Sequence, residues 1–141
     1  MTLYLDTSLL VASLTREAAT DRVLAWLHAA GQDDLMISDW VVTELASALS
    51  IKRRMGQLDA VHQANALTEF TRLCRATFTV LPVDRVHFRR AASLASQYSL
   101  GLRSGDALHL AICEDRGMTV CTLDRRLSDA CSEVGIARTL V

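Results

Sequence analysis

Hydrophobic residues in this chain form short runs, and longer stretches of helical spacing separate those runs. Runs of three to five apolar or β-branched residues are typical of buried strands, whereas Val23 and Leu27, or Leu45 and Leu49, repeat at the helical period. Strands are predicted over residues 3–5, 35–37, 78–81, 119–122 and 136–140. Helices are predicted over residues 8–14, 20–30, 39–55, 58–75, 84–98, 105–115 and 124–134.

This alternation of strands and helices predicts the fold class. Right-handed crossovers between successive strands give a mostly parallel sheet of about five strands that helices cover on both faces. The chain has 141 residues and one proline, Pro82, and contains no repeat or Pro/Gly-rich linker, so a single domain over residues 1–141 is expected. In such sheets ligands bind at the carboxyl ends of the strands.

Composition narrows the function classes. Half of the residues are apolar and 22% are charged, with a net charge of −1, so any polyanion must be held by a local patch or by metal ions. The first residues carry no basic leader and Asp6 interrupts their apolar run, and no apolar run approaches the roughly 20 residues of a membrane span. The four cysteines form no C-x-x-C pair. We expect a cytoplasmic protein with reduced thiols and no membrane association.

Four carboxylates are candidates for chemistry at the carboxyl edge of this sheet. Asp6 and Asp124 follow predicted strands, Glu44 lies in the opening turns of a helix, and Asp106 lies two residues after Ser104, a candidate helix cap. Four converging negative charges repel one another unless a cation neutralises them. Ligands that are all oxygen suit a hard ion, so Mg²⁺ or Mn²⁺ is the expected cofactor.

Each acid also has a structural interpretation. Asp6 and Asp124 are placed to cap the next helix, and Asp106 and Glu44 to stabilise the positive end of a helix dipole.

Two hydroxyl residues adjoin the acids. Ser8 follows Asp6 at a helix start, where it either caps the helix or supports the site. Thr122 precedes Asp124 on the same strand face and is expected either to orient that carboxylate or to serve as an ordinary β-branched strand residue.

Several other residues have two interpretations. Arg103 either binds a phosphate or pairs with a surface acid. Among the basic clusters, the pair Arg125-Arg126 is favoured for binding RNA because it adjoins Asp124. His109 shares a helix face with Asp106; a packed or supporting role is favoured over contact with RNA or proton transfer.

Taken together, the Asp6-Thr7-Ser8 start, Glu44, the segment RSGDALHLA at residues 103–111 and Thr122-Leu123-Asp124 resemble PIN-domain ribonucleases, in particular VapC-like toxins of type II toxin–antitoxin systems. The resemblance implies a three-layer α/β/α sandwich and Mg²⁺- or Mn²⁺-dependent cleavage of RNA. It maps the family's four catalytic and metal-binding acids onto Asp6, Glu44, Asp106 and Asp124. It also implies a homodimer and a cognate antitoxin, for which the apolar clusters at 9–11 and 41–42 are a candidate groove.

Other functions stay open at this point. A catalytically inactive PIN-like module that binds RNA or protein would use the same fold, although the complete acid set argues against it. A phosphatase of the haloacid type would need Asp-x-Asp where Ser8 stands, and a phosphoreceiver would need a lysine near the phosphate, whereas Lys52 is the chain's single lysine. The chain has neither of the glycine-rich nucleotide-binding motifs, G-x-x-x-x-G-K and G-x-G-x-x-G. The RNA target is not predicted.

Overall fold

A single parallel β-sheet forms the centre of the computed structural model, which describes residues 1–31 and 33–141. Its strands are β1 (Thr2–Leu5), β2 (Asp34–Ser38), β3 (Thr79–Leu81), β4 (Thr119–Thr122) and β5 (Arg138–Leu140). They lie in the order β3-β2-β1-β4-β5, and every neighbouring pair is parallel. The prediction of a mostly parallel sheet of about five strands is therefore confirmed.

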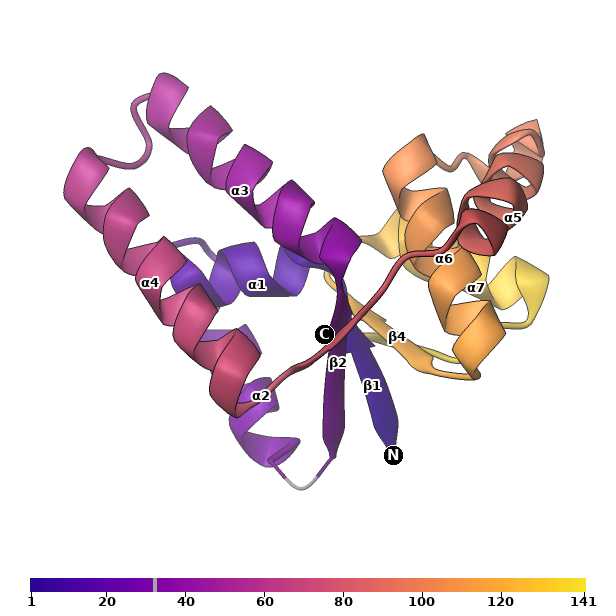
Figure 1. Cartoon of the computed structure of the whole chain (residues 1–141), viewed down its shortest axis with the longest axis horizontal. Coiled ribbons are helices and arrows are strands. Elements are labelled where there is room, and N and C mark those ends of the chain that lie inside the picture. Colours follow the sequence, from indigo (N-terminus) through magenta and orange to yellow (C-terminus); the bar gives the residue numbers. More distant parts are fainter. Residues whose placement is uncertain (32) are drawn as a thin grey trace.

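Helices cover both faces of the sheet. They are α1 (Thr7–Leu14), α2 (Thr20–Ala29), α3 (Asp39–Arg54), α4 (Ala60–Ala76), α5 (Arg85–Ala95), α6 (Ser104–Arg116) and α7 (Arg125–Val134), with a short 3₁₀ turn η1 (Tyr98–Leu100). Helices α1 to α4 lie on one side and α5 to α7 on the other, which makes the three predicted layers (Figure 1). This division follows from right-handed crossovers, because the chain moves from β1 towards β3 first and towards β5 afterwards.

The core lies along both faces of β1 and β4. Tyr4 and Leu5 of β1 and Val120 and Cys121 of β4 are fully buried, as expected for central strands of a covered parallel sheet. Helix α6 is buried on most sides, from Ala107 to Cys113. His109 is thereby carried into the interior of the molecule, and Asp106 is half-buried at the start of the same tightly packed helix.

Some predicted boundaries were wrong for local reasons. Helix α4 begins at Ala60 because the Asp59 side chain accepts the amide hydrogen of His62, 2.8 Å away, and so caps it. Ser104, predicted as a cap, is inside α6, whose N-cap residue is Arg103 and has no side-chain cap bond. The helix predicted over 84–98 ends at Ala95 and is followed by η1.

The sheet order determines where a site can form. Strands β2 and β3 are added on one side of β1, and β4 and β5 on the other. The strand order therefore reverses between β1 and β4, and the carboxyl ends of these two strands lie side by side at this switch point. The backbone amide of Asp6 donates to the carbonyl oxygen of Cys121 over 3.1 Å, which ties these two ends together. Among the described residues, no helix is both long and apolar enough to cross a bilayer.

Candidate functional site

Asp6 occupies the junction between β1 and α1 and is 4% exposed. Its Oδ1 accepts the hydroxyl of Ser8 at 2.5 Å and the amide of Leu9 at 3.3 Å, and its Oδ2 accepts the hydroxyl of Thr122 at 2.5 Å. Asp6 therefore caps α1, as one interpretation of its position predicted. Burial raises the pKa of Asp6, while the charge of His109 and the three hydrogen bonds partly oppose that rise.

The two hydroxyl residues connect Asp6 to the end of β4. Thr122 Oγ1 donates to Asp6 and accepts the amide hydrogen of Asp124 at 2.9 Å, so the prediction that it orients the Asp124 carboxylate is wrong: it orients Asp6. Ser8 Oγ similarly accepts the amide hydrogen of Leu123 at 3.0 Å. Both hydroxyls reach Asp6 because β1 and β4 are hydrogen-bonded neighbours.

Glu44 points from α3 towards α6. Its Oε1 accepts two hydrogen bonds, from Thr7 Oγ1 and from His109 Nε2, each 2.6 Å long. Its Oε2 lies beside Gly105, where an added Cβ would stand 2.8 Å from it. Burial by itself would raise the pKa of Glu44, but the hydrogen bonds from His109 and Thr7 and the charge of His109 lower it overall. The carboxyl group is therefore held in its ionised form.

His109 is 2% exposed, which confirms the favoured packed role. Its Nδ1 lies 2.7 Å from the hydroxyl oxygen of Tyr4, which is itself 2.8 Å from Ser38 Oγ. Burial raises the pKa of Tyr4 well above its ordinary value, so the phenol keeps its proton. Sequence reasoning missed Tyr4 as a partner in this site, and it placed the Thr7 hydroxyl beside Asp6 without predicting its bond to Glu44.

A polar pocket of about 580 Å³ is lined by half of the predicted site residues. Its walls are Trp40, Glu44, Arg103, Ser104, Gly105, Asp106, Asp124 and Arg126. Asp6 is not in its wall but lies close enough for its charge to act on Asp106. In the favoured pair Arg125-Arg126, both residues are exposed, and Arg126 lines the pocket whereas Arg125 does not. Asp124 also caps α7, accepting the amides of Arg126 and Leu127 at 2.8 and 3.3 Å.

The pocket has an excess of uncompensated negative charge. Burial raises the pKa of Asp106, and repulsion from Asp124, Glu44 and Asp6 raises it further, against the opposing charge of His109. In the described part of the chain, Asp6, Asp106 and Asp124 form no ion pair with a Lys, Arg or His. Oxygen donors without a counter-charge fit a hard divalent cation.

No ready-made metal cage is present among residues 1–31 and 33–141, since no three His, Cys, Asp or Glu side chains gather as one ligand cluster. The fit to a cation therefore rests on the oxygen chemistry and the unpaired charge of the pocket.

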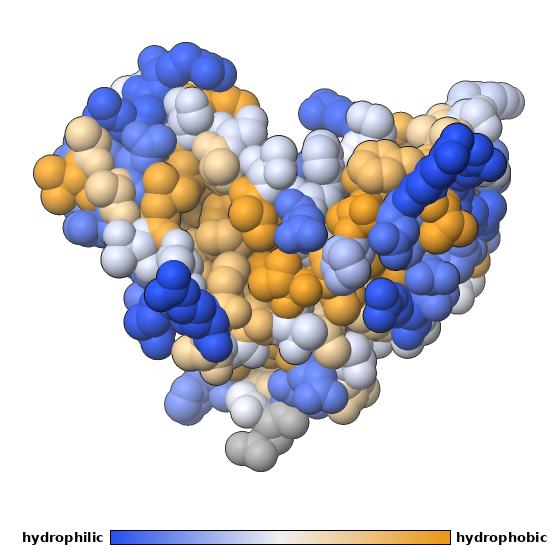
Figure 2. Space-filling view, viewed as in Figure 1, coloured by the Kyte–Doolittle hydropathy of each residue, from blue (hydrophilic) through white to orange (hydrophobic). Residues whose placement is uncertain are grey.

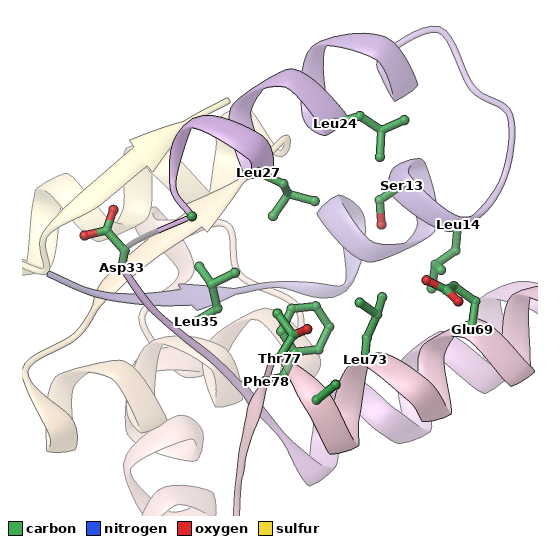
Figure 3. A pocket seen from close by; sticks show the side chains of 12 residues that line it. Ser13, Leu14, Leu24, Leu27, Asp33, Leu35, Glu69, Leu73, Thr77 and Phe78 are labelled. Atoms are coloured by element: carbon green, nitrogen blue, oxygen red, sulfur yellow. The ribbon is translucent and has the colours of Figure 1, made fainter.

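A second hollow is apolar and lies elsewhere. It opens between α1, α2 and α4, and Leu14, Leu24, Leu27, Leu73 and Phe78 are among the side chains around it (Figure 3). It borders the first residues of β2 and β3, at the opposite edge of the sheet from the acids. The groove predicted from residues 9–11 and 41–42 does not exist as such, because Leu9, Leu10 and Val41 are fully buried in the core.

Fold and site together define an α/β sandwich with an acidic pocket at the switch point of a parallel sheet. The model of the PIN domain family matches residues 3–133, and the chain therefore belongs to the PIN domain family.

Several solved structures share this fold. FitAcB from Neisseria gonorrhoeae is 22% identical with a TM-score of 0.70, over 96% of this chain and 95% of that one. VapC20 from Mycobacterium tuberculosis, described as a sarcin–ricin loop cleaving toxin, is 18% identical with a TM-score of 0.72, over 91% and 94%. DNA-bound VapBC from Salmonella typhimurium is 14% identical with a TM-score of 0.69, over 99% and 97%. A comparison with curated protein sequences finds no match.

Proposed function

We propose that this protein is a metal-dependent endoribonuclease and the toxin of a toxin–antitoxin pair. The observation that carries the proposal is the pocket that Glu44, Asp106 and Asp124 line, with Asp6 buried beside it and, among the described residues, no basic partner on the three aspartates. Membership of the PIN family and the fold shared with toxins such as VapC20 support it. A module that only bound RNA or protein would have no need for this concentration of unpaired acids.

We infer that Mg²⁺ or Mn²⁺ is held by Asp106, Asp124 and Glu44 together with Asp6. When bound, such an ion offsets the negative charge of the phosphodiester and makes water a better nucleophile near neutral pH. The protein's own part is to hold these carboxylates at one pocket in fixed orientations. Ser8 and Thr122 do this for Asp6 by donating hydrogen bonds to both of its oxygens.

The arginines at the pocket fit the substrate's phosphates. Arg103 and Arg126 line the same pocket as Asp106 and Asp124, so their guanidinium groups can hold a phosphate next to the acids. Arg125 precedes Arg126 at the start of α7 and is exposed, where it can contact RNA beyond the pocket. Because the chain's net charge is only −1 and its basic residues are scattered, binding depends on this local arrangement.

The proposal includes partners and a compartment. A cytoplasmic toxin of this kind pairs with an antitoxin, and FitAB, VapBC and a toxin–antitoxin complex from Klebsiella pneumoniae are among the similar structures.

We also propose a homodimer. Apolar surface gathers in the hollow between the α3–α4 pair and the α5–α6 pair (Figure 2), and Val86 and Phe88 of α5 are more than half exposed. Sedimentation of the purified chain should then give the mass of a dimer.

Digestion of RNA by the purified protein tests the proposal. Mg²⁺ or Mn²⁺ should support cleavage, EDTA should stop it, and the Asp106→Asn variant should be inactive with either ion. Asp129→Asn is the matched control, because Asp129 is an exposed acid on α7 away from the pocket. Cleavage that survives both EDTA and Asp106→Asn would contradict the proposal, and binding of RNA without any cleavage would favour the inactive module.

A further inference from the structure

The two carboxylate oxygens of Glu44 have different surroundings. Oε1 accepts hydrogen bonds from His109 Nε2 and Thr7 Oγ1, both at 2.6 Å. Oε2 accepts none from the described residues and lies beside Gly105, in the wall of the acidic pocket. The contacts on Oε1 therefore leave the other oxygen unbonded at the wall of the pocket that Asp106 and Asp124 also line.

Behind His109 the hydrogen bonds continue through buried side chains. Nε2 of His109 donates to the Glu44 carboxylate, and Nδ1 shares a hydrogen bond with the Tyr4 hydroxyl. The Tyr4 hydroxyl in turn shares a hydrogen bond with the hydroxyl of Ser38, whose oxygen accepts the amide hydrogen of Val41 at 3.4 Å. The side chains of Tyr4, Ser38 and His109 are all buried, and their hydrogen-bonding groups are paired. These hydrogen bonds hold the imidazole in one orientation.

Four separate elements contribute to this arrangement. Tyr4 comes from β1, Thr7 from α1, Ser38 from the end of β2 and His109 from α6. His109 stands one helical turn after Asp106 on α6, so a bond from His109 to Glu44 also sets the position of Glu44 relative to Asp106. A long glutamate side chain on α3 would otherwise sample several rotamers.

The geometry points to His109 and Thr7 as positioning residues that clamp Oε1 of Glu44 and so present Oε2 as a ligand for the divalent cation. Tyr4 and Ser38 orient the imidazole for this task. This inference rests on the proposed function, because it assigns how one acid of that same site is held. Residues that support metal ligands from behind commonly change metal affinity by about 10–100-fold when they are lost.

Two matched pairs of variants test the inference. In His109→Gln the amide nitrogen stands where Nε2 was and can still donate to Glu44, whereas in His109→Asn it stands where Nδ1 was and meets Tyr4 instead. Thr7→Ser keeps the second donor to Oε1 and Thr7→Val removes it. His28→Asn controls for the substitution itself, since His28 is exposed on α2. Mn²⁺ affinity is measured by electron paramagnetic resonance, with cleavage rate and melting temperature alongside.

We expect His109→Asn and Thr7→Val to bind Mn²⁺ about 10–100-fold more weakly and to cleave more slowly, with His109→Gln and Thr7→Ser close to the wild type. If His109→Asn does not fold, the Thr7 pair decides by itself. A wild-type protein that binds Mn²⁺ and cleaves RNA, while both members of each pair behave alike, overturns the inference and leaves the proposed function standing. A wild-type protein that neither binds Mn²⁺ nor cleaves overturns both.

Discussion

Asp6 shows how one residue can serve the fold and the site at once. Its carboxylate caps α1 through Leu9 and accepts hydroxyl hydrogens from Ser8 and Thr122, so a buried charge is satisfied without a basic partner. Three hydrogen bonds stabilise the ionised form, yet burial still raises its pKa. A residue whose function needed only a helix cap would be equally well an Asn or Ser. The retained charge is what suits a cation.

The Asp6→Asn variant should therefore separate capping from catalysis. Asn keeps the size and one acceptor oxygen, so the melting temperature should change by only a few degrees, while RNA cleavage should fall by more than the roughly 100-fold typical for loss of a supporting residue. Thermal denaturation and a single-turnover cleavage assay measure the two effects. Wild-type cleavage by a folded Asp6→Asn protein would show that Asp6 has no part in the chemistry.

Gly105 matters because of what lies next to it. A Cβ at this position would stand 2.8 Å from Glu44 Oε2 and 3.4 Å from the indole nitrogen of Trp40, both in the wall of the pocket. The glycine thus lets the first turn of α6 approach α3 closely.

Gly105→Ala should impair the site more than the fold. The better helix propensity of alanine, about 1 kcal/mol, opposes the strain of the contact, so the stability measured in urea should change little. Glu44 must move, so cleavage should decrease by about tenfold or more, a loss of about 1.4 kcal/mol in transition-state stabilisation. Urea titration and initial rates are the two measurements. Unchanged rates with unchanged stability would mean that the position of Oε2 is unimportant.

At the scale of elements, the helices that follow β1 and β4 carry the acids to one edge. Both α1 and α7 begin directly after a strand, and each is capped by the aspartate that also faces the site. Helix α6 brings Asp106 in its first turn, where the helix dipole favours a negative charge. The site is therefore assembled from helix starts, at the places where a parallel sheet exposes them.

Two substitutions of Asp124 distinguish its roles. Asp124→Asn can still accept the amides of Arg126 and Leu127, whereas Asp124→Ala cannot and should lower the free energy of unfolding by about 1 kcal/mol. Both variants lose the charge and should lose most cleavage activity. Chemical denaturation of the two variants, with RNA cleavage assays on each, tests this. If Asp124→Asn stays active while Asp124→Ala does not, Asp124 acts only as a cap.

The molecule as a whole places like charges together although its net charge is nearly zero. The raised pKa values of Asp6 and Asp106 mean that protons bind the folded state more tightly than the unfolded chain. These two groups therefore reduce the stability of the metal-free protein as pH rises above 3.8, the ordinary pKa of an aspartate, and through the raised pKa of the folded state. A bound cation would remove this penalty at neutral pH.

Divalent metal should accordingly raise the melting temperature at neutral pH. A concentration of about 100 times the Kd stabilises the folded state by about 2.7 kcal/mol. The gain should shrink as the solution is acidified towards the range where Asp6 and Asp106 take up protons, and it should be much smaller in Asp106→Asn. Calorimetry with Mg²⁺ and Mn²⁺ across pH provides the measurement. An equal gain in wild type and Asp106→Asn would place the ion elsewhere.

Much of this architecture was predictable because it depends on local pattern. Hydrophobic period and turn residues predicted the five strands and seven helices, and the positions of Asp6 and Asp124 after strands predicted their capping bonds. Parallel crossovers then predicted that both acids lie at one edge. Boundaries were less predictable where a single cap decides them, as Asp59 does for α4.

The contacts that complete the site depend on packing between distant segments. Glu44 and His109 are 65 residues apart, and Thr122 and Asp6 are 116 apart. Local pattern contains no information on such distances, so it linked Thr122 to the carboxylate of Asp124, whereas Thr122 binds that of Asp6. It also could not show which residue of the pair Arg125-Arg126 lines the pocket. Periodicity and strand-end positions along the chain establish which acids share an edge of the sheet. Only the packing of α3 and α6 against that edge determines which oxygen each hydroxyl and imidazole meets, because this depends on side-chain direction in three dimensions.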